Sequence, residues 1–214
     1  MKEKEMKITN AKYIDLTNLK PTATVHDILA TCSKAIKCNC ASVCIPTCYV
    51  SYMRHMYPKL NICTVVGFPH NNIPFDILIH QVSKAIIDGA NEIDMVANLS
   101  KYKNGHYNDI IEEINKIKKL LGNKILKVII ETCYLTKEEI RGLTKLVDNS
   151  NADYIKTSTG FGTGGATFED IKIMKKVITN GTKIKASGGI RTKEEVQKYI
   201  DMGCDRIGMS QLPR

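Results

Sequence analysis

Three ionisable side chains stand near the ends of short apolar stretches: Asp94 in EIDMV, Lys156 in YIKTS and Lys185 in KIKAS. A lysine with a neutral amine is a nucleophile that can form a Schiff base with a carbonyl compound. Two lysines held close together repel each other as ammonium ions, and burial disfavours the charged form further, so at least one pKa should fall. An acid such as Asp94 can then carry protons, directly or through a water. These residue types predict carbonyl chemistry that passes through a covalent lysine intermediate.

A purely structural role for the two lysines is the main alternative. Each ammonium group could instead pair with a carboxylate such as Asp94 or Glu131. That is the better interpretation for a single lysine at the end of a strand. Two lysines together with an acid and glycine-rich loops favour catalysis.

Glycine-rich segments follow the two lysines and the last apolar stretch of the chain. They are TSTGFGTGG (157–165), SGGIR (187–191) and GMSQ (208–211). Glycines let backbone N–H groups approach an anion closely, and the last two loops of a barrel commonly bind phosphate. The loops and the lysines together predict a lyase or isomerase that acts on a small phosphorylated carbonyl compound.

The elements that must position these residues alternate between short apolar runs and longer amphipathic ones. Segments 75–88 and 168–178, for example, have the apolar spacing of helices. Strands that alternate with helices pair in parallel through right-handed crossovers. Eight strands are predicted, at 12–16, 41–45, 61–66, 92–96, 127–131, 153–157, 183–187 and 205–208.

Eight strand–helix units in 214 residues indicate a single-domain (β/α)8 TIM barrel that spans residues 1–214. Two T-K-E-E sequences, which begin at Thr136 and Thr192, are typical capping boxes at helix starts. A doubly wound open sheet is the alternative architecture, but no G-x-G-x-x-G follows the first strand.

In such a barrel the active site lies at the carboxyl ends of the strands. Asp94 falls in the fourth predicted strand, and Lys156 and Lys185 fall in the sixth and seventh, which lie about 5 Å apart. Because side chains alternate along a strand, Glu92 shares a side with Asp94, and Lys183 shares a side with Lys185. The earlier member of each pair is expected to reach solvent at the bottom of the barrel, and the later member to face its upper interior.

The composition is that of an ordinary globular protein, with 43% hydrophobic and 25% charged residues. No apolar run approaches the ~20 residues that span a bilayer, and the N-terminal segment MKEKEMKITN lacks the apolar core of a signal peptide. A cytoplasmic protein without membrane contact is therefore expected. Its eight cysteines are then expected to be reduced thiols.

Four of the cysteines lie close together in CNCASVCIPTC, at Cys38, Cys40, Cys44 and Cys48. A zinc site is one interpretation, but paired C-x-x-C knuckles are absent and Cys44 lies in a strand-like run. The five histidines show no ligand spacing. Small buried thiols are favoured, and no metal site is predicted.

The formal charge of +9 favours anionic partners. Nucleic acid is one such partner, but the chain has no long Lys/Arg run, no RNP-like aromatic motif and no zinc-finger spacing. Many lysines fall in helical stretches such as 110–124, where a solvated face accounts for them. A small phosphorylated ligand explains the positive charge equally well, so the charge alone does not decide between these partners.

Eight segments of the chain resemble deoxyribose-phosphate aldolases. The resemblance runs in family order along nearly the whole chain, and KTSTGF together with KASGGIR is very specific. The segments are DLTNLKPTAT (15–24), SVCIPTCYV (42–50), VVGFPH (65–70), GANEIDMVAN (89–98), KVIIETCYLT (127–136), ADYIKTSTGFGTGGAT (152–167), IKASGGIRT (184–192) and GCDRIGMS (203–210).

The resemblance implies a class I aldolase on a TIM barrel that uses no metal or other cofactor. Such an enzyme reversibly cleaves 2-deoxy-D-ribose 5-phosphate into D-glyceraldehyde 3-phosphate and acetaldehyde, in deoxyribose phosphate catabolism. By position, Lys156 matches the Schiff-base lysine, Lys185 the second lysine that tunes it, and Asp94 the proton donor and acceptor. A homo-oligomer, either a dimer or a tetramer, is a further expectation. The matched phosphate-loop and pocket-lining positions are Thr17, Cys44, Gly160, Gly188, Gly189, Gly208 and Ser210.

Several positions depart from the family pattern. Leu16 stands where the family usually has a histidine, which puts a polar contact beneath the pocket in doubt. Thr47 and Asn71 replace a common proline and glycine, which matters more to loop shape than to chemistry. Gln211 stands where a second phosphate-binding serine is usual. None of the three catalytic positions is affected.

Two other classes of function make different demands on the sequence. A non-catalytic phosphate- or nucleic-acid-binding protein on a degenerate barrel would have lost the lysine pair or the acid, and all three are present. An isomerase with a lone carboxylate base would need a glutamate at a strand end, and it would show no sensitivity to borohydride.

Overall fold

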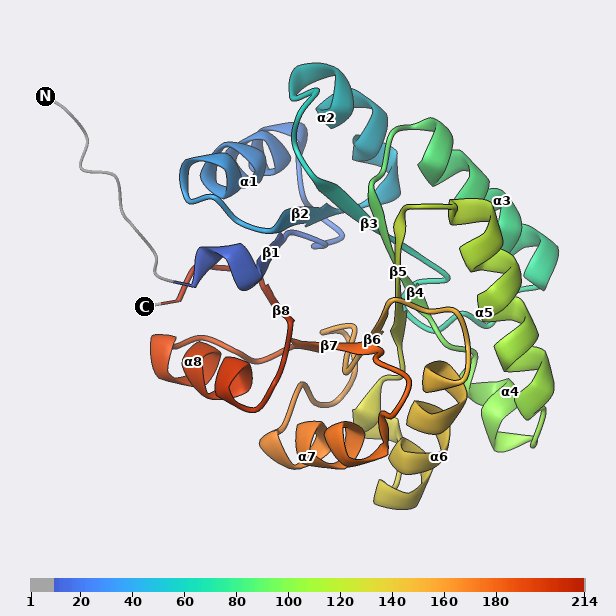
Figure 1. Ribbon diagram of the computed structural model, residues 1–214. Coiled ribbons are helices and arrows are strands. Elements are labelled where there is room, and N and C mark those ends of the chain that lie inside the picture. The colour runs from blue at the N-terminus through green and yellow to red at the C-terminus, as the bar shows by residue number, and fades with distance from the viewer. Residues whose placement is uncertain (1–9, 214) are drawn as a thin grey trace, which may run out of the picture.

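The structure is a computed structural model that describes residues 10–213. Eight parallel strands close into a barrel in chain order, with β8 paired to β1 (Figure 1). This closure confirms the predicted (β/α)8 fold and excludes the open sheet. The strands are β1 Ile14–Thr17, β2 Ser42–Ile45, β3 Ile62–Val66, β4 Glu92–Val96, β5 Ile125–Ile129, β6 Tyr154–Lys156, β7 Lys183–Ser187 and β8 Arg206–Met209.

The helices form a ring around the strands (Figure 1). Within residues 10–213, no helix is both long and apolar enough to cross a bilayer. The α-helices are α1 Val25–Lys37, α2 Val50–Met56, α3 Phe75–Ile87, α4 Leu99–Lys103, α5 Tyr107–Leu121, α6 Lys137–Asp148, α7 Phe168–Val177 and α8 Lys193–Asp201, and the short 3-10 helices are η1 Ala11–Tyr13, η2 Thr47–Tyr49 and η3 Thr132–Tyr134.

Threonine side chains define where several helices begin. The Thr136 side chain accepts the N–H of Glu139 before α6, and the Thr192 side chain accepts the N–H of Glu195 before α8. In each pair the glutamate carboxylate accepts the backbone N–H of the threonine. Both predicted capping boxes are therefore confirmed, and α1 begins with a third one at Thr24. These bonds satisfy backbone N–H groups that have no partner inside the helix.

The predicted strands agree with the observed ones to within two residues at each end. The bounds of β4 and β7 are those predicted, whereas β5 ends at Ile129 instead of reaching Glu131. The regular strand stops because Glu131 has a left-handed backbone, with φ of 47°. Pairing with β6 nevertheless continues, since the Ile130 N–H donates to the Lys156 carbonyl oxygen at 3.0 Å.

The apolar core lies between the barrel and its helices. Strand residues such as Ile93, Ile155 and Ile184 belong to one buried cluster with helix residues such as Ile114 and Leu143. The interior of a TIM barrel is usually filled by branched apolar side chains. Here charged side chains from β1 and from β4 to β8 meet across the barrel instead.

Candidate active site

Lys156 is the last residue of β6 and is only 3% exposed, yet it lines a cavity of about 360 Å³. The cavity lies among the loops that follow β1, β6, β7 and β8, at the carboxyl end of the barrel. Cavities of this size suit small-molecule ligands. A small carbonyl compound can therefore reach the Lys156 amine.

Six of the other predicted site residues line the same cavity, and most of them are glycines. Gly188 and Gly189 have φ values of 87° and 80°, which residues with side chains rarely adopt. At Gly208 there is no room for a side chain, since a Cβ atom would lie 2.8 Å from the Cβ of Ser187. The six residues are Thr17, Gly160, Gly188, Gly189, Gly208 and Ser210.

Asp94 joins the two predicted lysines. The Nζ atoms of Lys156 and Lys185 each lie 2.7 Å from the same carboxylate oxygen, Asp94 Oδ2. The register of β6 and β7 sets Lys156 opposite Lys185, as the sequence predicts. The structure thus brings the three predicted catalytic side chains together, and it also shows the lysine–carboxylate pairing of the alternative interpretation.

A third lysine, Lys127 of β5, binds the other oxygen of Asp94. Its Nζ lies 2.8 Å from Asp94 Oδ1 and 2.6 Å from Glu92 Oε2, and its side chain is fully buried. Lys127 is not among the site residues predicted from the sequence. The available signal was one charged residue inside the apolar run ILKVI.

Two further carboxylates and an arginine complete the group. Lys185 Nζ lies 2.6 Å from Asp15 Oδ2, and Arg206 binds both Asp15 and Glu92. Glu92 is 1% exposed, so the expectation that it reaches solvent is wrong, whereas Lys183 is exposed as expected. We call these side chains the buried charge cluster; they are Asp15, Glu92, Asp94, Lys127, Lys156, Lys185 and Arg206.

Lys185 is not a lysine whose pKa is lowered by repulsion between the amines. Burial by itself would lower the pKa of Lys185, but the carboxylates of Asp15 and Asp94 raise it above its ordinary value. Lys127 opposes this rise only in part. Lys185 is therefore an ammonium ion at neutral pH.

The two aspartates of the cluster have lowered pKa values. Burial would raise the pKa of Asp94, but the three lysine amines around it hold this pKa well below its usual value. The pKa of Asp15 is lowered against the same effect of burial, most strongly by Lys185. Both carboxylates are therefore ionised at neutral pH.

These lowered pKa values predict that the protein loses stability on acidification. A carboxylate whose pKa is depressed by folding stabilises the fold above its unfolded pKa, about 3.9 for aspartate, and this contribution is lost as the pH falls through the folded pKa. The free energy of unfolding in urea should therefore decrease from about pH 5 downward, by about 1.4 kcal/mol for each pKa unit between the folded and unfolded states.

The matched control for this pH dependence is Asp109→Asn, which removes a carboxylate that is 59% exposed. This variant should retain the acid sensitivity of the wild type, because an exposed carboxylate contributes little to it. A urea midpoint that stays constant between about pH 6 and pH 3 would contradict the prediction.

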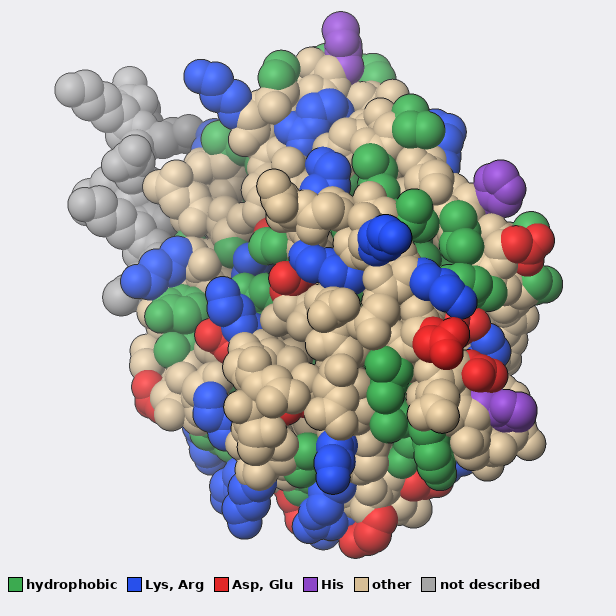
Figure 2. All heavy atoms as spheres, turned by 45° about the vertical axis from the view of Figure 1, so that its right-hand side comes forward, with side chains coloured by type: hydrophobic (Ala, Val, Ile, Leu, Met, Phe, Trp, Pro, Cys, Tyr) green, Lys and Arg blue, Asp and Glu red, His purple; other side chains and the backbone are tan. Residues whose placement is uncertain are grey.

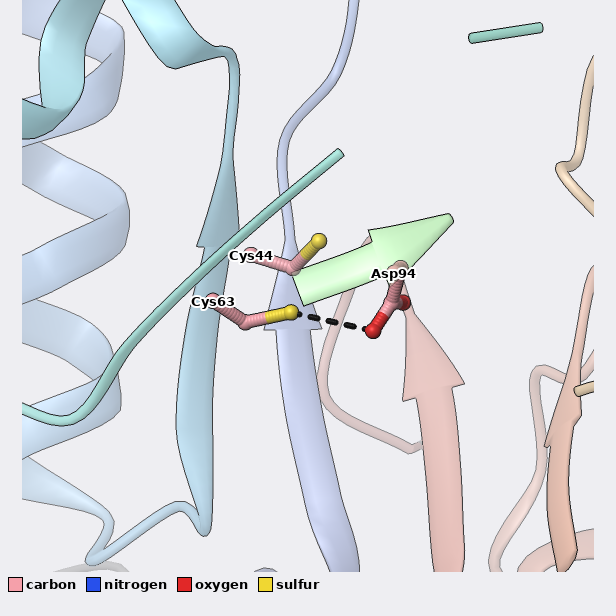
Figure 3. A group of neighbouring side chains, drawn as sticks. All are labelled: Cys44, Cys63 and Asp94. Carbon is pink, nitrogen blue, oxygen red and sulfur yellow. Dashed lines mark hydrogen bonds between the residues drawn. The ribbon is translucent and has the colours of Figure 1, made fainter. Parts of the chain in front are cut away.

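Two thiols lie beside Asp94, on the neighbouring strands β2 and β3 (Figure 3). The Cys63 thiol donates to Asp94 Oδ1 at 3.1 Å, and burial raises the pKa of Cys63. A hydrogen bond with Cys63 lowers the pKa of Cys44. Cys44, which the resemblance places at the pocket, is fully buried and is not among the residues that line the cavity.

The side chains of Figure 3 offer two sulfur atoms and one oxygen within 4.8 Å of one another, a spacing that could hold a metal ion. Lysine amines already bind both oxygens of Asp94, so a cation here would meet positive charge. The group is better described as a hydrogen-bonded part of the cluster. Cys48 is exposed, and Cys38 and Cys40 pack against the apolar core, so the cysteine-rich segment does not converge on one point.

Glu131 does not belong to the buried charge cluster. Among residues 10–213, no lysine forms an ion pair with it; its carboxylate accepts the Thr159 N–H at 3.1 Å and also binds the Thr159 hydroxyl. Glu131 is 1% exposed and is not part of the cavity lining. This geometry disfavours an isomerase in which a glutamate at a strand end acts as the base.

The basic surface side chains are dispersed. Figure 2 shows Lys and Arg side chains scattered over the visible face, with Asp and Glu side chains among them. A nucleic-acid-binding protein typically gathers its basic residues into a patch or stripe. On this face, the formal charge of +9 therefore does not form such a patch.

Comparison with known proteins identifies the family. The model of the DeoC/LacD family of aldolases matches residues 9–210. The chain belongs to this family. A deoxyribose-phosphate aldolase of Clostridium botulinum (strain Alaska E43 / Type E3) is 54% identical over 201 residues, 94% of this chain and 91% of the relative. One of Clostridioides difficile (strain 630) is 46% identical over 202 residues, with coverage of 94% and 92%.

Solved structures show the same barrel in other aldolases. The aldolase QR15 has a TM-score of 0.90 at 36% identity, with 94% of this chain and 90% of that chain covered. The tetrameric deoxyribose phosphate aldolase from Aeropyrum pernix has a TM-score of 0.87 at 27% identity, with coverage of 94% and 86%. This DeoC/LacD family aldolase is thus an enzyme, a carbon–carbon lyase, as the resemblance implied.

Proposed function

We propose that this aldolase is a class I enzyme that reversibly cleaves 2-deoxy-D-ribose 5-phosphate into D-glyceraldehyde 3-phosphate and acetaldehyde. The observation that carries the proposal is the Lys156 amine in a cavity rimmed by glycine-rich loops. The amine offers a covalent site for a carbonyl carbon, and the loops offer N–H donors for a phosphate. Relatives that are named deoxyribose-phosphate aldolase, at 54% and 46% identity, support this choice of substrate.

Lys156 is the cation of the cluster that has the fewest carboxylate partners. Four cationic side chains face three carboxylates, so one positive charge is in excess when all seven are ionised. The other three cations each contact at least two carboxylates, whereas Lys156 contacts only Asp94. Lys156 is thus the amine of the cluster that carboxylates hold least, and it is also the one that lines the cavity, where the reaction needs a nucleophile.

Bond making and breaking then follow from the Schiff base. The Lys156 amine attacks the C1 aldehyde of the open-chain sugar, and loss of water gives a protonated imine. The imine accepts the electrons of the C2–C3 bond, which breaks as the C3 hydroxyl loses its proton, and glyceraldehyde 3-phosphate leaves. The remaining enamine takes a proton at C2, and water hydrolyses the imine to release acetaldehyde and the free amine.

Asp94 and Lys185 carry the protons in this proposal. Asp94 contacts Lys156 at 2.7 Å, so it can take the proton that the amine gives up. Because its pKa is lowered, Asp94 returns to the ionised form between steps and stabilises the positively charged imine. Lys185 lies 2.7 Å from the same oxygen, and transfers to the substrate pass through its ammonium group or a water.

The phosphate of the substrate is proposed to bind at the far side of the cavity from Lys156. Gly188 and Gly189 offer backbone N–H groups in a conformation that suits anions, and Ser210 offers a hydroxyl. Lys20 and Arg191 also line the cavity and add positive charge at its rim.

The proposal extends to the setting in which the enzyme works. We place it in deoxyribose phosphate catabolism in the cytoplasm, with no nucleic-acid or membrane partner; its eight free thiols suit a reducing compartment. A homo-oligomer, either a dimer or a tetramer, is proposed because the aldolase from Aeropyrum pernix is tetrameric.

Borohydride trapping tests the covalent step. Reduction in the presence of acetaldehyde should convert the imine into a stable ethyl-lysine, and mass spectrometry should locate it at Lys156. An adduct found mainly at Lys185 would contradict the assignment of the nucleophile. A coupled assay for glyceraldehyde 3-phosphate tests the substrate, and activity that persists in a chelator tests metal independence.

Gln211→Ser should tighten binding of the phosphorylated substrate. Gln211 is exposed beside Ser210 and is not among the residues that line the cavity, whereas a serine hydroxyl could donate to the phosphate. A hydrogen bond to a charged group contributes about 1.5–3 kcal/mol, so the KM should fall roughly tenfold or more with little change in kcat.

Unphosphorylated deoxyribose is the control substrate for Gln211→Ser, and its kcat/KM should stay unchanged. If the substitution instead raises the KM of the phosphorylated sugar, Gln211 is itself a phosphate ligand and the prediction is wrong.

A further inference from the structure

Glu131 is a buried carboxylate beside the cavity that the proposed chemistry does not use. It precedes η3 with φ of 47° and ψ of 66°, and it is 1% exposed. A residue other than glycine persists in this left-handed region only when its surroundings hold it there. The hydrogen bonds of its side chain show which segment of the chain packs against Glu131.

Nearly all of these contacts are made with one turn of the chain. Glu131 Oε1 and Oε2 accept the Thr159 N–H at 3.1 and 3.3 Å, and Oε2 also binds the Thr159 hydroxyl. The Thr159 hydroxyl oxygen in turn accepts the Phe161 N–H at 3.0 Å. Within residues 10–213, the only other hydrogen-bond partner of the carboxylate is the Cys133 thiol, at 3.8 Å, and no ion pair with Glu131 is found. A buried carboxylate usually has a cationic partner, whereas Glu131 is stabilised by hydrogen bonds from the turn.

The turn belongs to residues 157–165, which we call the β6 loop because it directly follows Lys156. The loop packs closely on Glu131: a Cβ atom on Gly162 would lie 3.2 Å from Glu131 Cδ. On its other side the loop is tied to β7, since the Ser187 hydroxyl donates to the Ser158 carbonyl oxygen at 2.6 Å. Glu131 and Ser187 therefore hold the β6 loop from opposite sides.

The part of the loop that Glu131 holds is a wall of the cavity. Thr159, Gly160 and Phe161 all line it, together with Gly188 and Gly189 of the next loop. The Phe161 ring, although 46% exposed, packs edge-on against Phe68 with ring centroids 5.3 Å apart. The position of this wall therefore affects the shape of the cavity, which Phe161 and the glycines line together.

We infer that Glu131 is a positioning residue, which fixes the turn Thr159–Phe161 as the cavity wall and thereby sets the affinity for the phosphorylated sugar. The inference rests on the proposed function for its substrate. Glu131 does not touch the substrate and acts through Thr159. Because the wall contacts the substrate before and during reaction alike, its displacement weakens ground-state and transition-state binding together.

Two isosteric substitutions test the inference from opposite ends of the contact. Glu131→Gln and Thr159→Val should each raise the KM for 2-deoxy-D-ribose 5-phosphate about tenfold, with kcat within about threefold of wild type. The double variant should be little worse than either single one, because both remove the same interaction. Thr159→Ser keeps the hydroxyl, so this variant should have the wild-type KM. Glu138→Gln, on an 81% exposed side chain, is the matched control and should leave KM unchanged.

Hydrogen exchange provides a readout that does not depend on activity. In Glu131→Gln, the amides of residues 157–165 should exchange faster, while those of 183–187 keep their wild-type protection. Borohydride with acetaldehyde should still label Lys156, since the amine is untouched. A lowered Tm with unchanged KM and unchanged exchange in the β6 loop would overturn the inference, as would additive effects in the double variant. If the wild type fails to cleave the sugar phosphate, the proposed function is wrong, and the exchange result still decides whether Glu131 holds the loop.

Discussion

Lys156→Met should abolish cleavage of 2-deoxy-D-ribose 5-phosphate and leave the protein folded. Methionine fills a similar volume but has no amine, so no imine can form and kcat/KM should fall by at least about 10⁴-fold. The variant should be no less stable than the wild type, because the three remaining cations of the cluster balance its three carboxylates. A coupled assay measures the loss, and a Tm within about 4 °C of wild type shows that the fold persists.

Lys183→Met is the matched control, since Lys183 is an exposed lysine on the neighbouring strand β7. It should retain the wild-type kcat/KM and the borohydride adduct at Lys156. Turnover of Lys156→Met above about 1% of wild type, with an adduct on another lysine, would show that Lys156 is not the nucleophile.

Asp94→Asn should be both inactive and unstable, which separates it from Lys156→Met. It leaves four cations facing two carboxylates inside the barrel. Removal of one partner from a buried ion pair costs about 3–5 kcal/mol, and loss of a general acid–base group lowers kcat about 10²–10⁴-fold. Urea unfolding at neutral pH measures the first effect, and the coupled assay measures the second.

The control for Asp94→Asn is Asp109→Asn, because the Asp109 side chain is 59% exposed. This variant should change neither the free energy of unfolding nor kcat appreciably. Wild-type stability in Asp94→Asn would contradict its place as the shared counter-ion of three lysines. Wild-type turnover in a folded Asp94→Asn protein would remove it from the proton transfers.

The architecture of this protein could be predicted from its amino-acid sequence. Eight apolar runs alternating with amphipathic segments predicted the barrel, and threonines such as Thr136 and Thr192 predicted helix starts that the structure confirms. These features depend on residues a few positions apart, so periodicity and capping patterns reveal them. The pairing of Lys156 with Lys185 was predictable as well, because neighbouring strands of a parallel barrel carry their functional residues to the same end.

The contacts among the buried charges could not be predicted, because they join residues that are far apart in the chain. Arg206 and Asp15 are 191 positions apart in the chain, and they touch because β8 closes the barrel against β1. Lys127 looks in the sequence like any charged residue in a strand, and it binds Asp94 because the register of β4 and β5 sets the two opposite each other. Local spacing does not encode the register across a closed barrel, so the sequence did not indicate the role of these residues.

The pKa of Lys185 shows how contacts between distant strands change the properties of a residue. Two adjacent lysines alone predict that at least one of their pKa values falls; burial would lower that of Lys185, but Asp15, brought in from the first strand, and Asp94 raise it. The same limit applies to Glu131, which binds Thr159 across 28 positions of sequence. Electrostatic and hydrogen-bond energies depend on distances across the folded interior, and only the closed barrel determines those distances.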